Sequence, residues 1–186
     1  MGVRRGAIAF TSALAVVASI LVASGPGARA NDFGGTNASC PSVCYHYRAH
    51  QDYWYDSSLT QEWEDESDWA RQENINPTDM SSSKVGGHGL ADIAVFRDDY
   101  PESWYGATEC WDANGSECEH WHVFFNSTWG PYDQQQKRSL ACHEFGHTTG
   151  LHERPTHGDN ASCMETPHWH THFNDHDTNH INDYYS

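Results

Sequence analysis

The spacing of apolar and polar residues along this chain predicts a mixed domain of strands and helices. Apolar residues dominate "LADIAVFRD", which favours a strand over about 90–97. The segment "EHWHVFFN" alternates between polar and apolar positions, which favours a second strand that ends near Asn126. An aromatic segment that ends near Asp56 favours an earlier strand.

Two longer stretches have helical spacing. The first predicts a helix over about 60–74, and we expect its many carboxylates to face solvent. The second begins at Asp133, which can cap a helix together with Gln136, and it ends at Gly150. Near the C-terminus, "DTNHINDYY" predicts a short helix capped by Asp177.

The N-terminus has the pattern of a secretory signal peptide. Two arginines and an apolar run of small residues precede an Ala-x-Ala cleavage pattern at 28–30. We therefore expect residues 1–30 to be removed, which leaves 31–186 as a single secreted domain. The alternative, an uncleaved membrane anchor, is disfavoured by the small residues and by the breaker pair Gly25-Pro26.

The chain is strongly acidic, with 10 Lys and Arg residues against 26 Asp and Glu residues. Removal of the signal segment would take three basic residues and no acidic ones, so that the net charge changes from −16 to −19. Such a surface repels nucleic acid and anionic lipid. We therefore expect no nucleic-acid partner, no membrane contact after cleavage, and a soluble monomer.

All six cysteines lie after the signal segment, and an even number in an exported chain favours disulfides over zinc ligation. Six cysteines can pair in many ways, and the sequence does not choose among them. We expect the local bonds, which are Cys40–Cys44, Cys110–Cys118 and Cys142–Cys163.

The stretch "CHEFGHTTGLHER" at 142–154 carries the most specific chemistry of the chain. On a helix, His143 and His147 lie one turn apart on the same face, where two imidazoles can bind one Zn²⁺ ion. Glu144 is rotated by roughly 100° from His143, so it can reach a zinc-activated water without binding the metal. Glu144 would then act as general base when that water attacks a carbonyl group.

This motif resembles the metzincin zinc proteases, whose pattern is H-E-x-x-H-x-x-G-x-x-H, and small secreted bacterial matrixin-like and snapalysin-like proteins. Met164 in "SCMET" is similar to the methionine turn that lies under the zinc in that family. The resemblance covers most of 85–186. It implies an α+β zinc-metalloprotease domain with a twisted, mostly parallel sheet, an antiparallel edge strand and two main helices. The cleft would lie between the zinc helix and the edge strand, which would be "EHWHVFFN" or the stretch before it.

The third zinc ligand departs from the family pattern, because that position is Glu153 and not a histidine. A carboxylate oxygen is an acceptable zinc ligand, and the register after a fixed glycine favours Glu153. His152 is the alternative, because histidine is the commoner donor and a tighter turn would bring it to the metal. A remote glutamate, Glu165, is a third option, although the second helix that should carry it is not evident.

Two further features lie near the motif. A bond between Cys142 and Cys163 would link the zinc helix to the methionine turn. Alternating histidines at 168, 170 and 172 could form a second, adventitious metal site, but a polar surface segment is the preferred interpretation.

The sequence therefore predicts a secreted, zinc-dependent endopeptidase with a peptide or protein substrate. His143, His147 and Glu153 (or His152) would hold the metal, and Glu144 would be the catalytic base. The alternative is an extracellular, histidine-rich zinc-binding protein without catalytic activity.

Overall fold

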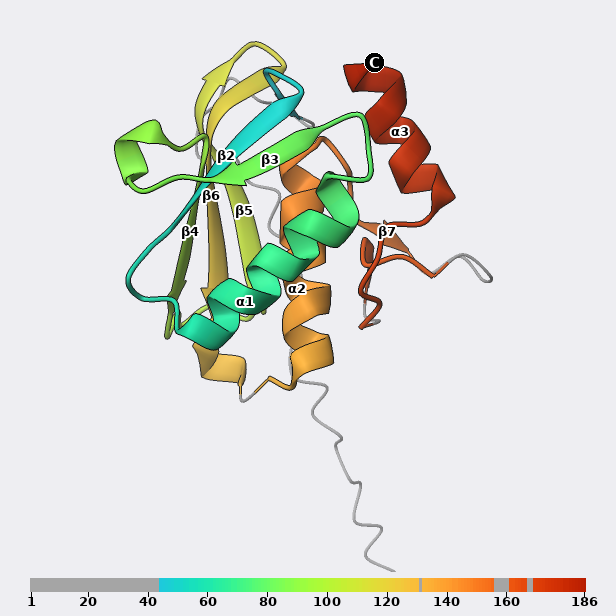
Figure 1. Cartoon of the computed structure of the whole chain (residues 1–186). Helices are drawn as coiled ribbons and strands as arrows, with labels where there is room; N and C mark the ends of the chain where they lie inside the picture. Colours follow the sequence, from blue (N-terminus) through green and yellow to red (C-terminus); the bar gives the residue numbers. More distant parts are fainter. Residues whose placement is uncertain (1–43, 131, 156–160, 167–168) are drawn as a thin grey trace, which may run out of the picture.

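The computed structural model describes residues 44–130, 132–155, 161–166 and 169–186 (Figure 1). Its strands and α-helices are β1 (Tyr45–His46), β2 (His50–Tyr55), α1 (Gln61–Ala70), β3 (Ser81–Lys84), β4 (Ile93–Asp98), β5 (Gly106–Asn114), β6 (Glu117–Asn126), α2 (Gln134–Thr148), β7 (Arg154–Pro155), β8 (Glu165–Thr166) and α3 (Asp175–Tyr185). Three short helical turns complete them: η1 (Arg71–Ile75), η2 (His88–Leu90) and η3 (Ser127–Trp129).

The main sheet has six strands and is mostly parallel, as the family resemblance implies. Its order is β1-β6-β4-β2-β3, and β5 pairs with β6 as the single antiparallel strand. β4 runs parallel to β6 with Val95 opposite Val123, while β5 places Thr108 opposite Val123 on the other side. The antiparallel edge is therefore β5, the stretch before "EHWHVFFN", and β6 lies inside the sheet.

Three element boundaries differ from the sequence prediction. β4 begins at Ile93 and not near 90, because the residues before it form the turn η2. The first helix is regular only to Ala70 and continues as the π-helical turn η1. The last helix is capped by Asn174 and not by Asp177. Asp177 is the third helical residue, and its carboxylate accepts from the backbone N–H of Asn174 to complete a capping box.

Helices α1 and α2 pack together on one face of the sheet, and the core lies between these two layers. Trp63 of α1 stacks on Phe125 of β6 with ring centroids 4.6 Å apart, and Phe145 of α2 meets Tyr53 of β2 edge to face at 4.9 Å. The prediction of a solvated carboxylate face on the first helix is wrong for Glu66. Glu66 is buried and accepts a hydrogen bond from Arg138 Nε on α2 at 2.5 Å.

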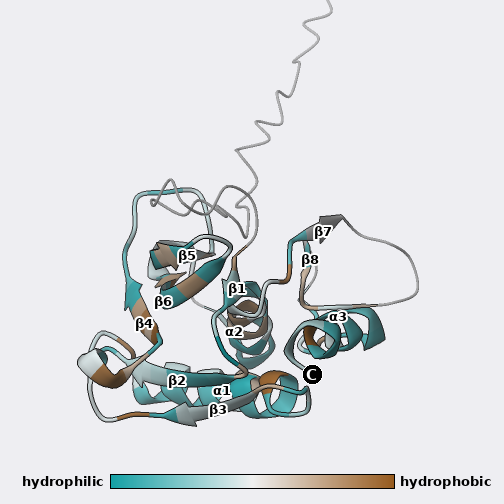
Figure 2. Ribbon diagram, turned by 90° about the horizontal axis from the view of Figure 1, so that it is seen from above, coloured by the Kyte–Doolittle hydropathy of each residue, from teal (hydrophilic) through white to brown (hydrophobic). Residues whose placement is uncertain are grey.

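The third helix, α3, lies on the far side of α2 from β4, and the two views agree on this placement (Figures 1 and 2). The turn between β3 and β4, which contains η2, projects from the opposite side of the molecule, away from α2 (Figure 1). The zinc-motif helix is therefore enclosed by protein on both sides.

Helix α2 ends in a left-handed turn at Gly150, whose φ is +94°. Gly150 N donates to the His147 carbonyl at 3.1 Å, and Leu151 N donates to the Gly146 carbonyl at 3.2 Å, which together form a Schellman motif. A side chain at Gly150 would also collide with the ring of Tyr45. The predicted role of Gly150 as the end of the helix is confirmed, and the chain reverses directly after the second histidine.

Two disulfides lie wholly within the described residues: Cys110–Cys118 across the β5–β6 hairpin, and Cys142–Cys163 between α2 and the segment before β8. Cys44 is also disulfide-bonded, but Cys40, its expected partner, lies outside the described residues. The predicted signal peptide lies outside them as well. In the part of the chain that the structure describes, every helix is too short or too polar to span a bilayer.

Candidate metal centre and active site

The two histidines of the motif face each other in the interior of the protein. His143 and His147 lie one turn apart on α2 and are almost completely buried. Their Nε2 atoms are 3.1 Å apart. The helix therefore brings together the same two imidazoles that the spacing of the motif predicts to share a metal.

Each of these rings is oriented by a backbone carbonyl. His143 Nδ1 lies 2.7 Å from the Cys163 carbonyl oxygen, and His147 Nδ1 lies 2.8 Å from the Leu151 carbonyl oxygen. A carbonyl can only accept, so both Nδ1 atoms carry the hydrogen. In the neutral rings, the two Nε2 lone pairs are then directed into the same small space, the arrangement that metal-binding histidines have in proteins.

The distance between the two Nε2 atoms fits a zinc ion. Two Zn–N bonds of about 2.0–2.1 Å at a tetrahedral angle separate the nitrogens by roughly 3.3 Å. The observed 3.1 Å is close to this value. Burial lowers the pKa of both His143 and His147, which keeps the rings neutral and their lone pairs available.

Glu144 points from α2 toward the edge strand β5 and is fully buried. Thr108 on β5 donates its hydroxyl to Glu144 Oε2 at 2.8 Å. The other oxygen, Oε1, is buried and has no hydrogen-bond partner among the described residues. Burial raises the pKa of the Glu144 carboxyl to about 8; the Thr108 hydrogen bond lowers it, and the charge of Glu153 raises it. A cation held by the two histidines would favour the ionised form of Glu144.

A glycine on β5 makes room for this carboxylate. A methyl group on Gly106 would lie 2.5 Å from Glu144 Oε1 and 2.9 Å from its Cδ. Such separations are shorter than van der Waals contact, so only glycine lets the edge strand approach the carboxylate this closely.

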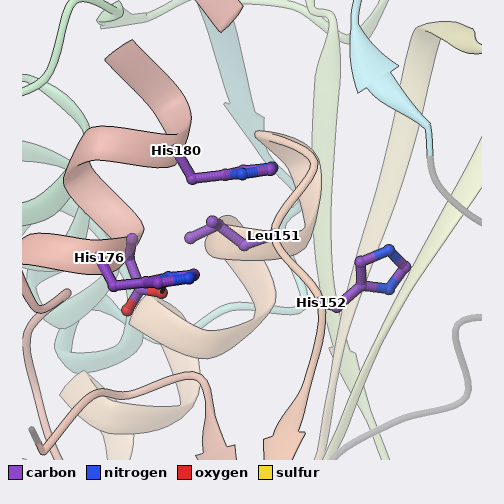
Figure 3. A pocket seen from close by; sticks show the side chains of 5 residues that line it. Leu151, His152, His176 and His180 are labelled. Carbon is purple, nitrogen blue, oxygen red and sulfur yellow. Dashed lines mark ion pairs between the residues drawn. The ribbon is translucent and has the colours of Figure 1, made fainter. Parts of the chain in front are cut away.

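Two of the predicted third ligands, His152 and Glu153, follow directly after the turn at Gly150. Burial lowers the pKa of His143 and raises that of Glu144. The negative charge of Glu153 opposes the first shift and adds to the second, so its carboxylate acts on both groups. His152 is exposed and its ring points away from His176 and His180 of α3 (Figure 3). Glu165, the remote option, is buried in β8.

Met164 packs against helix α2 at Gly146, one residue before His147. Its side chain is fully buried, and its sulfur occupies the space where a side chain on Gly146 would project. Met164 N donates to Ser162 Oγ at 3.0 Å, and Ser162 in turn donates to Asp177 of α3. The helix, the methionine and α3 are therefore packed as one unit, and the Cys142–Cys163 disulfide adds a covalent link.

A second group of histidines was not predicted. In the described ranges, one set of three ligand atoms lies within 4.8 Å of one another, and it belongs to His88, His120 and His122. Burial lowers the pKa of His120, and it lowers the pKa of His122 to about 4. The signal in the sequence is the H-x-H spacing of "EHWHVFFN", which places two imidazoles on one face of a strand.

The C-terminal histidines do not form such a set in the part of the chain that the structure describes. His172 packs edge to face on Trp69 at 5.1 Å, which is an ordinary packing contact. His168 lies outside the described residues.

No family model and no curated protein matches the chain. Two solved structures of myroilysin are similar to it, each with 14% sequence identity. One has a TM-score of 0.43 and covers 59% of this chain and 52% of that one; the other has a TM-score of 0.44 and covers 67% and 52%. The chain therefore spans about half the length of these structures.

Proposed function

We propose that this protein is a secreted, zinc-dependent endopeptidase that acts as a monomer. The observation that carries the proposal is the buried group of His143, His147 and Glu144, in which two imidazole lone pairs converge at 3.1 Å beside a carboxylate. A buried carboxyl with an unpartnered oxygen is costly to fold around unless a function requires it. The predicted disulfides support an oxidising, extracellular location.

The proposal gives each residue of the site a separate role. His143 and His147 would hold the metal, with Glu153 as third ligand, and the ion when bound would act as a Lewis acid toward a carbonyl group and a water molecule. Glu144 would take the proton of the attacking water and then give it to the leaving amine. Thr108 holds one oxygen of Glu144 and leaves Oε1 to accept that proton.

The edge strand β5 is the expected site for the substrate. It pairs with β6 on one side, and among the described residues no strand pairs with its other side. An extended peptide can add to such an edge through main-chain hydrogen bonds. Because Thr108 and Gly106 on β5 contact Glu144, a peptide on this edge would lie beside the catalytic base.

The proposal is tested by incubating the purified chain with an unfolded protein and sequencing the new amino termini by mass spectrometry. We expect internal cleavage that stops with 1,10-phenanthroline and returns when Zn²⁺ is added back in excess. A chain that binds zinc but yields no new termini would contradict the proposal.

Replacement of Glu153 by Gln is expected to weaken zinc binding by about 10–100-fold, because an amide is a poorer zinc ligand than a carboxylate. Replacement of His152 by Gln should change the affinity by less than about twofold if Glu153 is the ligand. Competition with a chromophoric chelator measures both. The opposite order of effects would identify His152 as the third ligand.

The alternative function is zinc binding without catalysis, and the cluster of His88, His120 and His122 favours it, because a zinc store needs more than one site. A zinc-storage function predicts that each chain binds several zinc ions and that it does not cleave peptides. The buried Glu144 counts against it, because a storage site has no need for a carboxylate that does not bind the metal.

A further inference from the structure

Three histidines from two separate parts of the chain converge on the face of the sheet that is opposite to the helices. His120 and His122 alternate along β6, while His88 comes from the η2 turn between β3 and β4. Their ring centroids are 5.3 Å, 5.7 Å and 6.1 Å apart, and one nitrogen of each ring lies within 4.8 Å of the others. This spacing is wide enough for an ion to be held between the three nitrogens.

Two of the three rings have a buried nitrogen without a hydrogen-bond partner among the described residues. Nε2 of His120 and Nε2 of His122 are buried, and neither has a hydrogen-bond partner among the described residues. Buried polar atoms are normally paired in folded proteins, so two adjacent exceptions need an explanation. Imidazole nitrogen is the commonest protein ligand for transition metals, and a shared ion would satisfy both atoms.

Aromatic side chains pack against two of the three rings, those of His122 and His88. Trp111 stacks on His122 with centroids 4.6 Å apart, and Phe96 meets the same ring edge to face at 5.2 Å. Trp54 meets His88 edge to face at 5.0 Å. Rings fixed in this way lose little conformational entropy when they bind an ion.

The turn that supplies His88 is rich in glycine. Glycines at 86, 87 and 89 flank the histidine, and a side chain added to any of them would meet nothing within 4 Å. His88 itself is exposed. A bond from His88 to an ion on β6 would therefore tie a glycine-rich connection to the sheet.

This cluster is separate from the proposed active site. Trp121, Val123 and Phe125 of β6 point into the core beside α2, so the alternating residues His120 and His122 point away from it. The sheet lies between the two groups of histidines, and an ion in one cannot serve the other.

We propose that His88, His120 and His122 form a second metal site, which binds one Zn²⁺ ion and fastens the β3–β4 turn to the sheet. Three nitrogen ligands select a borderline transition metal over Ca²⁺ or Mg²⁺, which prefer oxygen. Three protein ligands leave the fourth position of a tetrahedral ion for water or for a carboxylate. Asp112, which lies opposite His120 in register, is placed to influence that position.

The proposal is tested by the zinc content of four chains after equilibration in a Zn²⁺ buffer, measured by plasma mass spectrometry. We expect two zinc ions in the parent, one in His120→Gln/His122→Gln, one in His143→Gln/His147→Gln, and two in the control His176→Gln, an exposed histidine of α3. Added Zn²⁺ should also raise the Tm of the His143→Gln/His147→Gln chain by about 5 °C or more. Circular dichroism reports whether each variant is folded.

Two results would overturn the proposal: two zinc ions retained in a folded His120→Gln/His122→Gln chain, or none in a folded His143→Gln/His147→Gln chain. If the His143→Gln/His147→Gln chain does not fold, the zinc content of the other two variants still tests the proposal. Only the loss of one ion from His120→Gln/His122→Gln supports the second site. Peptide cleavage should persist in His120→Gln/His122→Gln, so a failure of this proposal and a failure of the proposed peptidase are distinguishable.

Discussion

Replacement of Glu144 by Gln is expected to lower kcat/KM for peptide cleavage by about a thousandfold, while zinc affinity changes little. Glutamine has the shape of glutamate and can still accept the Thr108 hydroxyl, which lies 2.8 Å from Glu144 Oε2. It cannot take a proton from water at neutral pH, so the general base is lost and the two imidazoles are unchanged. Steady-state cleavage of a quenched fluorescent peptide, together with the zinc content, measures both effects.

The matched control is Glu73→Gln, which makes the same change at an exposed position of the turn η1. Its kcat/KM should equal that of the parent. A Glu144→Gln chain that cleaves as fast as the parent would exclude Glu144 as the base. If the variant instead loses its zinc, the side chain is a metal ligand, and the division of roles proposed for the site is wrong.

Replacement of Gly106 by Ala is expected to lower kcat/KM by about a hundredfold, because a displacement of about 1 Å at a reacting group has an effect of this size. The added methyl would lie 2.5 Å from Glu144 Oε1 and would push the carboxylate away from its position beside Thr108. The contact is with the end of a side chain, so the loss should appear in activity more than in stability.

A double-mutant cycle separates this effect from a general disturbance of the strand. In a Glu144→Gln background, Gly106→Ala should reduce kcat/KM by less than about threefold further, because the group that it displaces is already inactive. Gly86→Ala, whose added methyl meets nothing within 4 Å, should have parental activity. A hundredfold loss in both backgrounds would mean that Gly106 supports the strand and not the carboxylate.

The sequence predicts best where local chemistry sets the structure. Both ends of α2 follow from Asp133, Gln136 and Gly150, because capping and left-handed turns depend on neighbouring residues. The start of α3 was predicted wrongly for a related reason. Asn174 and Asp177 are both good capping residues, and the sequence does not show that the two act together in one capping box.

Features that need long-range contacts were not predictable. His88 and His120 come together only because the turn before β4 folds over β6, and no local pattern links them. The close approach of Gly106 to Glu144 likewise depends on the pairing of β5 at the edge of the sheet. The burial of Glu66 depends on Arg138 of another helix. In each case the partner lies more than thirty residues away in the chain.

The most direct test of the central claim is anomalous scattering at the zinc edge from a crystal of the protein grown with stoichiometric Zn²⁺. The proposed function predicts a peak in contact with Nε2 of His143 and Nε2 of His147, with an oxygen of Glu153 completing the set and Glu144 close to the ion but not bound to it. A crystal in which zinc scatters only from the cluster of His88, His120 and His122, or not at all, would contradict the assignment of the motif as a zinc peptidase site.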